Sequence, residues 1–284
     1  MNVVTLPDGE QVPALGLGTW RMGEQARARK DEIAAVRFAI EHGYRLIDTA
    51  EMYGEGGAEE VIGAALAALF AAGSVRREEL FIVSKVYPQN ASRGGVVTAC
   101  ERSLKRLGLD RIDLYLLHWR GQHPLSATLD GFRALQEARK IRHWGVSNFD
   151  ADDMDELRST AGGGACAANQ VYYSASHRGV EFDLLPWQRQ HGVPLMAYCP
   201  IDQGALAKDR TFAAVGERLG VTAAQAALAW TLREPGVMAI PKAVREVHLR
   251  ENFAAAKLAL SAADLTAIDR AHPPPRRKQP LAMT

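Results

Sequence analysis

The sequence predicts a (β/α)8 barrel, and three observations carry that prediction. Eight short apolar runs recur along the 284 residues, and each is followed by a stretch with helical periodicity. Continuous apolar strands that alternate with helices are typical of a parallel sheet covered by helices. Eight such units fit within about 250 residues, the usual size of a closed barrel. A doubly wound open sheet is the alternative arrangement.

The expected strands and helices follow one another from residue 14 onward. We expect strands at residues 14–18, 45–48, 80–85, 112–119, 143–148, 167–171, 194–200 and 237–242. We expect helices near residues 31–42, 57–72, 93–107, 125–140, 150–159, 181–191, 209–219, 222–233 and 245–257. Before the first strand, "VVTL" and "QVPAL" flank the turn Pro7-Asp8-Gly9, which predicts a β-hairpin.

The end of the chain is expected to add no second domain. The segment "PPPRRKQP" (273–280) is proline-rich and should be extended and partly exposed. In a barrel it would lie over one face. No low-complexity linker interrupts the interior of the chain, so residues 1–284 are interpreted as a single barrel domain.

Composition narrows the class of protein. The chain has 34 basic and 33 acidic residues, which gives no electrostatic reason to expect binding to nucleic acid or an anionic membrane. The N-terminus does not resemble a signal peptide, and no apolar run approaches the length of a membrane span. Cys100, Cys166 and Cys199 are widely spaced, which favours free thiols in a reducing compartment. We therefore expect a cytoplasmic monomer.

Polar residues stand at the ends of nearly all the expected strands. These residues are Asp48, Lys85, His118, Ser147, Asn148, Asn169, Gln170, Tyr198 and Lys242. Active sites of such barrels lie at the carboxyl ends of the strands. Charged groups are rarely buried unless they are paired. Asp48 and Lys85 end neighbouring strands, so each is expected to be the partner of the other.

Tyr53 lies five residues after Asp48, within a glycine-rich turn. The ordinary pKa of tyrosine, near 10, is high for a general acid at neutral pH. A nearby ammonium such as that of Lys85 favours the phenolate and would lower this pKa. Tyr53 would then donate a proton to an oxygen that gains negative charge, while His118 orients that oxygen. These groups suit carbonyl reduction, and the hydride must come from a cofactor.

Each of these residues, taken alone, has an ordinary structural explanation. Asp48 and Lys85 could form a structural ion pair, and Tyr53 or His118 could be a packed core residue. A metal-dependent hydrolase that uses His118 and Asp48 is an alternative function. The sequence argues against it, because it has no His-x-His pair, no further carboxylates at strand ends, and no cysteine spacing typical of a metal site. No metal is expected.

The ordered motifs resemble those of the aldo-keto reductases along essentially the whole chain. The motifs include "GLGTW", "IDTAEMYG", "SKVYP", "LDRIDLYLLHW", "KIRHWGVSNF", "NQVYY", "AYCP" and "IPKAVREVHLRENF". The resemblance implies a barrel, a catalytic tetrad of Asp48, Tyr53, Lys85 and His118, and a nicotinamide cofactor bound without a Rossmann fold. The sequence agrees with the absence of a Rossmann fold, because "GLGTWR" has Arg21 at the third glycine position of the G-x-G-x-x-G motif.

The resemblance also implies a set of residues that contact the cofactor. They are Thr19, Trp20, Asp48, Ser147, Asn148, Gln170, Tyr198, Pro200, Ile201, Gly204, Lys242, Ala243, Val244, His248 and Asn252. Among them, Ser147, Asn148 and Gln170 match residues that hold the nicotinamide carboxamide, and Tyr198 matches the ring that stacks on it. Lys242 stands just before a helix N-terminus, a combination that binds phosphate.

Two positions depart from the usual pattern and bear on the choice of cofactor. Ala243 stands where a serine is common, and His248 stands where an arginine is usual, although Arg245 could compensate. These changes weaken the case for NADPH over NADH but do not remove it, so NADPH is still the expected cofactor, with NADH as a weaker alternative. A cofactor-binding subunit that regulates an ion channel is another alternative that the resemblance allows. The intact tetrad and the lack of an appended segment argue against it.

The expected substrate is a small carbonyl compound. The strand-end aromatics Trp20, Tyr87 and Trp119, with Tyr53 and His118, are expected to line the substrate pocket. The segments "EMYGEGGAEEVIG" and "RGVEFDLLPW" most resemble bacterial members that reduce methylglyoxal and other small aldehydes. Pocket aromatics and a short closing loop fit a small or flat aldehyde, such as an aromatic aldehyde, better than a steroid.

Overall fold

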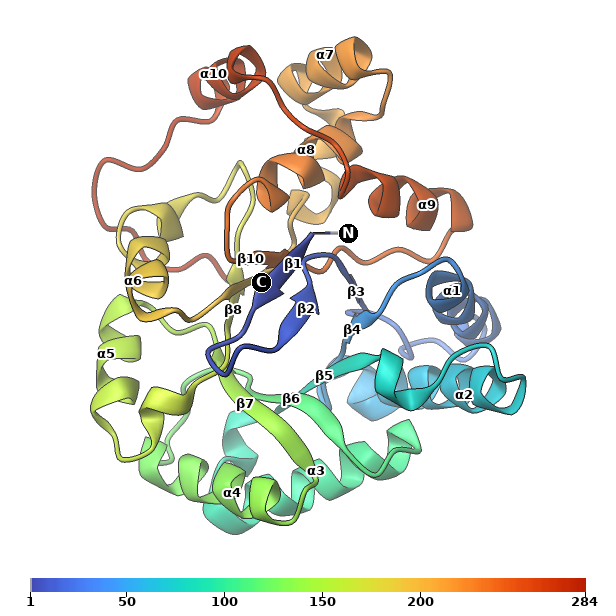
Figure 1. Cartoon of the computed structure of the whole chain (residues 1–284), viewed down its shortest axis with the longest axis vertical. Helices are drawn as coiled ribbons and strands as arrows, with labels where there is room; N and C mark the ends of the chain where they lie inside the picture. The colour runs from blue at the N-terminus through green and yellow to red at the C-terminus, as the bar shows by residue number, and fades with distance from the viewer. Residues whose placement is uncertain (1) are drawn as a thin grey trace.

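A barrel of eight parallel strands forms the centre of the structure, a computed structural model that describes residues 2–284 (Figure 1). The strands are β3 (Gly16–Gly18), β4 (Leu46–Asp48), β5 (Phe81–Val86), β6 (Ile112–Leu117), β7 (Ile141–Ser147), β8 (Asn169–Tyr172), β9 (Leu195–Tyr198) and β10 (Val237–Ala239). They pair in sequence order from β3 to β10. Parallel bridges between Leu15 and Ala239 and between Gly18 and Lys242 join the first strand to the last. The predicted barrel is thereby confirmed, and the open sheet is excluded.

Closure of the barrel depends on a glycine in β3. A Cβ atom on Gly18 would lie 2.5 Å from the carbonyl oxygen of Ile240, well inside van der Waals contact. The Gly18 amide instead donates a hydrogen bond of 3.1 Å to the carbonyl of Pro241. The absence of a side chain therefore lets the two ends of the sheet meet.

The predicted hairpin covers one end of the barrel (Figure 1). Its strands, β1 (Val3–Thr5) and β2 (Gln11–Pro13), pair antiparallel. Val4, Leu6 and Val12 belong to the same buried apolar cluster as Leu46 and Phe81, the first residues of β4 and β5. The hairpin therefore closes the end where the strands begin, and the opposite end stays free for a site.

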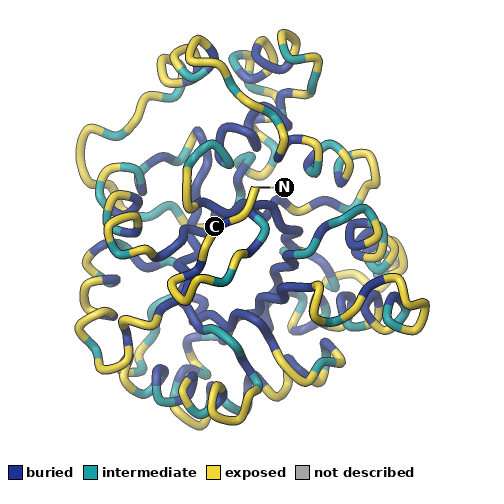
Figure 2. Tube along the Cα trace, in the orientation of Figure 1, coloured by how far each residue is buried: buried dark blue, intermediate teal, exposed yellow. Residues whose placement is uncertain are grey.

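Within residues 2–284, ten helices surround the strands, and a second, larger apolar cluster fills the space between helices and barrel. They are α1 (Arg29–Glu41), α2 (Gly57–Ala71), α3 (Arg93–Leu107), α4 (Leu125–Glu137), α5 (Ala151–Ser159), α6 (Leu184–His191), α7 (Arg210–Leu219), α8 (Ala223–Leu232), α9 (Glu246–Ala255) and α10 (Ala262–Ala271). Figure 2 shows buried residues concentrated in the barrel and exposed ones on the outer helix faces.

Several helices begin where a short polar side chain caps them. Ser92 accepts a hydrogen bond from the Gly95 amide at the start of α3, and Asp150 forms a capping box with Asp153 in α5. These caps end the loops that follow the strands.

The tenth helix, α10, was not predicted. Its signal was present in the sequence, because Ser261 and Asp264 form a capping box ahead of a short apolar stripe.

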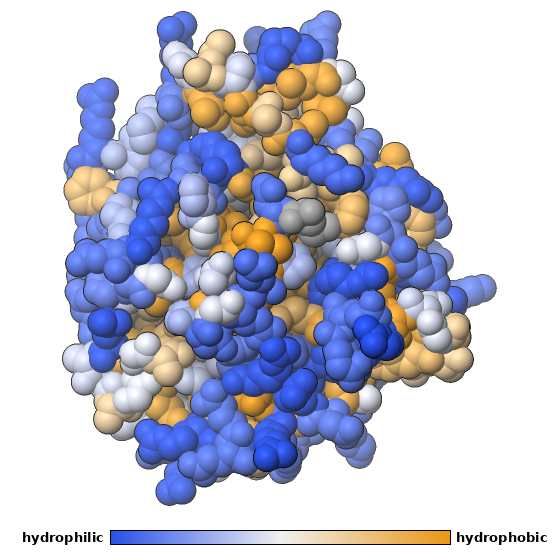
Figure 3. Space-filling view, in the orientation of Figure 1, coloured by the Kyte–Doolittle hydropathy of each residue, from blue (hydrophilic) through white to orange (hydrophobic). Residues whose placement is uncertain are grey.

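On the face that carries the hairpin, hydrophilic residues predominate and apolar areas are limited (Figure 3). Within residues 2–284, no helix is both long enough and apolar enough to cross a bilayer. Residues 273–284 contain no helix or strand, as expected for the proline-rich segment.

Candidate active site

Four polar side chains meet at the carboxyl end of the barrel. Lys85 Nζ lies 2.8 Å from Asp48 Oδ2 and 3.1 Å from the Tyr53 hydroxyl oxygen. The same ammonium donates a hydrogen bond of 2.8 Å to the carbonyl of Thr49. The rings of Tyr53 and His118 meet edge to face, with 5.8 Å between their centroids. The structure thus brings together the four residues that the sequence analysis assigned to catalysis, and Asp48 and Lys85 are the predicted pair.

A sharp turn places Tyr53 beside this ion pair. The 3-10 segment Tyr53–Gly56 follows β4, and Gly54, Glu55 and Gly56 all have positive φ angles. Glycine adopts such angles without steric cost. A Cβ atom on Gly54 would also lie 2.8 Å from the carbonyl carbon of Gly23. The glycines therefore allow the chain to reverse at once after Tyr53 and to start α2.

Burial controls the protonation of the ion pair. The side chains of Lys85 and Asp48 are 0% and 2% exposed. Burial raises the pKa of Asp48 and lowers the pKa of Lys85, while the charge of each residue offsets part of the desolvation of the other. Gln170 Nε2 donates a second hydrogen bond, of 2.7 Å, to Asp48 Oδ1. Both carboxylate oxygens are therefore held by donors.

The pKa of Tyr53 shifts in the direction opposite to the one expected from its lysine neighbour. Burial raises this pKa well above the ordinary value, and the Asp48 carboxylate acts in the same direction. Desolvation of the phenolate thus outweighs the attraction of the Lys85 ammonium. Tyr53 is consequently a neutral phenol, which can donate a proton.

His118 is held as a neutral imidazole. Burial lowers its pKa well below the ordinary value, and the nearby positive charge of Lys85 lowers it further. His118 Nδ1 is buried and has no hydrogen-bond partner among residues 2–284. A buried ring nitrogen without a partner is costly unless a ligand or water completes its hydrogen bond.

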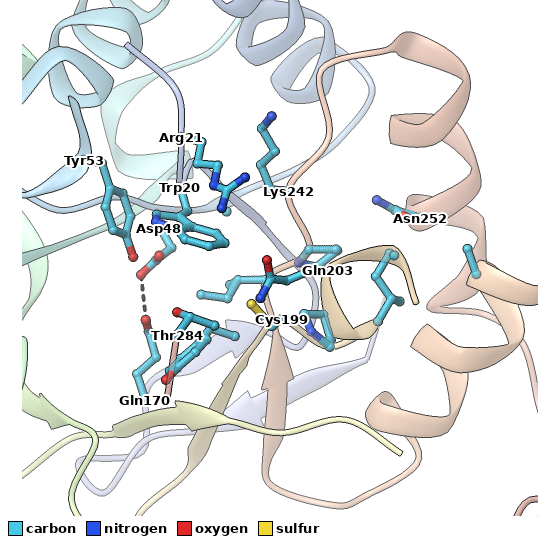
Figure 4. A pocket seen from close by; sticks show the side chains of 18 of the residues that line it. Trp20, Arg21, Asp48, Tyr53, Gln170, Cys199, Gln203, Lys242, Asn252 and Thr284 are labelled. Atoms are coloured by element: carbon cyan, nitrogen blue, oxygen red, sulfur yellow. Dashed lines mark hydrogen bonds between the residues drawn. The ribbon is translucent and has the colours of Figure 1, made fainter. Parts of the chain in front are cut away.

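A cavity of about 740 Å³ opens at this end of the barrel. In Figure 4, Asp48, Tyr53 and Gln170 lie on one side of the cavity, and Lys242 and Asn252 lie on the other. One continuous space therefore joins Asp48, Tyr53 and His118 to the start of α9. Its volume lies within the range of about 300–1,000 Å³ that is usual for ligand pockets.

Polar groups near the four clustered side chains form a connected network. The Tyr198 hydroxyl donates a hydrogen bond of 2.9 Å to Asn148 Oδ1. Asn148 Nδ2 in turn donates to the carbonyl of His118 and to Ser147 Oγ. Asn148, Gln170 and Tyr198 line the cavity, whereas Ser147 is buried behind Asn148. The network fixes amide and phenol groups that could hold a planar ring.

Basic side chains lie at the far end of the cavity. Lys242 and His248 line it, and Lys242 makes no ion pair within residues 2–284. The Arg245 guanidinium donates a hydrogen bond to His248 Nε2. Arg245 also precedes α9, and no side chain caps the first backbone amides of this helix. Free amides at a helix N-terminus and a nearby cation could hold a phosphate.

Comparison with known proteins agrees with this geometry. The model of the Aldo/keto reductase family matches residues 14–273. The chain belongs to the Aldo/keto reductase family. Methylglyoxal reductase YeaE of Escherichia coli (strain K12) is 47% identical over 277 residues, which cover 96% of this chain and 95% of that relative. Glyoxal reductase of Bacillus subtilis (strain 168) is 34% identical, over a match that covers 94% of this chain and 92% of that relative.

A solved structure shows the same fold. The crystal structure of an aldo/keto reductase from Klebsiella pneumoniae in complex with NADP and acetate is 48% identical, covers 99% of both chains and has a TM-score of 0.94. This aldo/keto reductase is accordingly an NAD(P)H-dependent oxidoreductase. The predicted resemblance to bacterial reductases of methylglyoxal is confirmed.

The structure places several of the predicted contact residues outside the cavity lining of this reductase. Thr19 is buried and donates a hydrogen bond of 2.9 Å to the carbonyl of Asp48. Ala243 and Val244 pack against the apolar core beside Lys242. Tyr87 meets the Trp119 ring edge to face, with 5.9 Å between the centroids, and stands behind this residue instead of in the lining. These residues support the site through their neighbours.

Lys85 and Ser147 are also buried outside the lining. The other predicted residues do line the cavity. They are Trp20, Asp48, Tyr53, His118, Trp119, Asn148, Gln170, Tyr198, Pro200, Ile201, Gly204, Lys242, His248 and Asn252. The sequence analysis missed other lining residues, which include Arg21, Met52, Gln203, Met283 and Thr284. For Arg21 and Met52 a signal existed, since each stands next to a predicted site residue. Met283 and Thr284 carried no such signal.

Proposed function

We propose that this protein reduces small aldehydes and ketones, methylglyoxal among them, to alcohols with NADPH as the cofactor and Tyr53 as the proton donor. One observation carries the proposal. The Tyr53 hydroxyl lies 3.1 Å from Lys85 Nζ and faces a cavity that continues to Lys242. The relatives named for reduction of methylglyoxal and glyoxal support the same substrate class.

The residues present fit a nicotinamide cofactor. Asn148, Gln170 and Tyr198 would hold the nicotinamide end, and Lys242 with the free amides of α9 would hold the phosphate of the adenosine end. The cofactor, when bound, supplies the hydride that no side chain can supply. Two solved structures of Klebsiella pneumoniae aldo-keto reductases, with NADP and with NADPH, support this assignment.

Tyr53 and its neighbours would handle the proton. A carbonyl oxygen that gains negative charge needs a donor, and the neutral phenol of Tyr53 provides one. The Lys85 ammonium then stabilises the phenolate that remains, and Asp48 keeps Lys85 in position through their 2.8 Å ion pair. The neutral imidazole of His118 would hydrogen-bond the same carbonyl oxygen and orient it.

The cofactor preference follows from the groups at the far end of the cavity. NADPH carries a 2′-phosphate that NADH lacks, and Lys242 is a cation that lines the cavity just ahead of α9. His248 and Arg245 are hydrogen-bonded to each other and would share the remaining phosphate contacts. NADH should therefore bind more weakly.

The substrate end of the cavity is mainly apolar. Trp20, Met52 and Trp119 line it next to Tyr53 and His118. Such a surface favours a compact carbonyl compound without a large polar substituent.

We further propose that the chain acts as a cytoplasmic monomer. Cys100, Cys166 and Cys199 are free thiols, which supports a reducing compartment. The cavity that runs from Tyr53 to Lys242 is within the size range of a ligand pocket in one copy of the chain, which supports a monomer. Light scattering of the purified protein across a range of concentrations tests the oligomeric state.

Replacement of the proposed acid tests the function. Tyr53→Phe should reduce the turnover of methylglyoxal by roughly a hundredfold or more, because it removes the donor and keeps the ring. NADPH binding, measured by quenching of protein fluorescence, should stay close to that of the unaltered protein.

Tyr115→Phe is a matched control. Tyr115 is buried in β6, and its hydroxyl has no hydrogen-bond partner among residues 2–284. This variant should keep normal turnover. Near-normal turnover in Tyr53→Phe would show that another group donates the proton.

A further inference from the structure

The end of the chain forms part of the cavity wall. Met283 and Thr284 line the same cavity as Tyr53 and Lys242. In Figure 4, Thr284 lies on the side of Asp48, Tyr53 and Gln170, away from Lys242 and Asn252. Residues 273–284, here called the tail, therefore contribute to the end of the cavity where the carbonyl compound would bind.

The tail has few contacts that could hold it there. Within residues 2–284, no backbone hydrogen bond joins the tail to the rest of the protein. A second cavity of about 580 Å³ lies between the tail and the barrel. Pro273–Pro275, Arg276 and Arg277 line it from the tail, and Ser176 and Arg178 line it from the barrel. The first half of the tail consequently bridges a hollow, with little packing beneath it.

An ionic contact follows directly after this hollow. Lys278 Nζ lies 2.7 Å from Asp152 Oδ2, 3.6 Å from Asp183 Oδ2 and 4.0 Å from Asp150 Oδ2. Asp150 and Asp183 are the capping residues of α5 and α6, and Asp152 lies in the first turn of α5. Among the tail side chains after Lys278, Leu281 alone packs against the apolar core, and it is partly buried.

We propose that Lys278 is a positioning residue for the carbonyl end of the cavity. Its ion pairs with the three aspartates hold the tail in place, so that Met283 and Thr284 complete the cavity wall. The inference deepens the proposed function and depends on it for the identity of the substrate. Asp150 and Asp183 each accept a hydrogen bond from a backbone amide at the start of their helix, which fixes two of the three carboxylates that face the lysine.

Lys278→Gln tests the proposal, because it removes the charge and keeps most of the length of the side chain. With saturating NADPH, the KM for methylglyoxal should rise about 2–5-fold, the scale expected of an exposed ion-pair network, while kcat stays unchanged. Trypsin cleavage after Arg277, followed by intact mass, should accelerate by a similar factor. The Kd of 2′,5′-ADP, a probe for the Lys242 end alone, should not change.

Two further variants separate position from charge. Lys278→Arg keeps the charge and should behave as the unaltered protein. Lys257→Gln removes an exposed lysine that makes no ion pair within residues 2–284, and it should change neither KM nor cleavage. At about 1 M salt, where the screening length falls to about 3 Å, the difference between Lys278→Gln and the unaltered protein should disappear.

Several outcomes would overturn the proposal. Unchanged KM and unchanged trypsin cleavage in Lys278→Gln would show that the ion pairs do not hold the tail. A lower KM would show that the tail obstructs the carbonyl instead of completing its site. If the unaltered protein reduces no carbonyl compound, the proposed function fails, and the rate of trypsin cleavage still decides whether Lys278 anchors the tail.

Discussion

Removal of Lys85 should destabilise the fold as well as abolish activity. Lys85→Met deletes three hydrogen bonds from the ammonium, to Asp48, Thr49 and Tyr53, at distances of 2.8, 2.8 and 3.1 Å. The Asp48 carboxylate, 2% exposed, would keep only its hydrogen bond from Gln170. Loss of one partner of a buried ion pair costs roughly 3–5 kcal/mol of unfolding free energy. The melting temperature should therefore fall by on the order of 10 °C.

The pH dependence of this loss has a definite sign. Burial raises the pKa of Asp48, whereas the charge and hydrogen bond of Lys85 lower it. In Lys85→Met the folded-state pKa should rise further above the unfolded value. A carboxyl group whose pKa is higher in the folded state than in the unfolded state contributes stability at pH values below its unfolded-state pKa. That stability is lost as the pH rises through the folded-state pKa. The gap in unfolding free energy between the variant and the unaltered protein should thus be smaller at pH 5 than at pH 8.

Urea unfolding of both proteins across this pH range measures the gap. The double variant Lys85→Met/Asp48→Asn is the control, because it removes the unpaired charge and should recover part of the lost stability with no dependence on pH from this site. A gap that is equal at pH 5 and pH 8, or a double variant less stable than Lys85→Met, would refute the reasoning.

Two further predictions concern the cofactor and His118. Lys242→Ala should weaken the binding of NADPH much more than the binding of NADH. His248→Arg should selectively strengthen the binding of NADPH, because a guanidinium can pair with a phosphate through two parallel hydrogen bonds. Fluorescence titration with both cofactors measures these affinities, and equal effects on the two cofactors would contradict the prediction. His118 has a lowered folded-state pKa, so the stability it provides is present above pH 6.5 and is lost as pH falls below that value. The stability advantage of the unaltered protein over His118→Gln should consequently shrink between pH 6.5 and pH 5, with a slope of at most about 1.4 kcal/mol per pH unit, and an advantage that grows on acidification would contradict it.

The strands and the four clustered residues could be predicted because their signals are local. Apolar runs such as residues 112–117 indicate a buried strand from composition alone. In a parallel barrel, polar residues that follow such runs must emerge at one end, so the sequence predicts that Asp48, Lys85 and His118 lie close together. The helix α10 was missed because its apolar stripe is short, although its capping box was visible.

Other features were decided by the tertiary structure alone. The direction in which the pKa of Tyr53 shifts depends on the balance between burial and the Lys85 charge. The burial is set by packing from several strands. Thr19 and Ser147 stand next to cavity residues in the sequence, yet both are turned into hydrogen bonds behind the lining.

The tail shows the limit of sequence reasoning most clearly. The sequence indicated an extended, proline-rich segment, but its route depends on contacts with residues more than a hundred positions earlier, such as Asp152. Local periodicity determined the strands, the helices and the polar residues at the strand ends, because each depends on near neighbours. Which side chains face the cavity, and how strongly each charge is desolvated, depends on distant segments that only the closed barrel brings together.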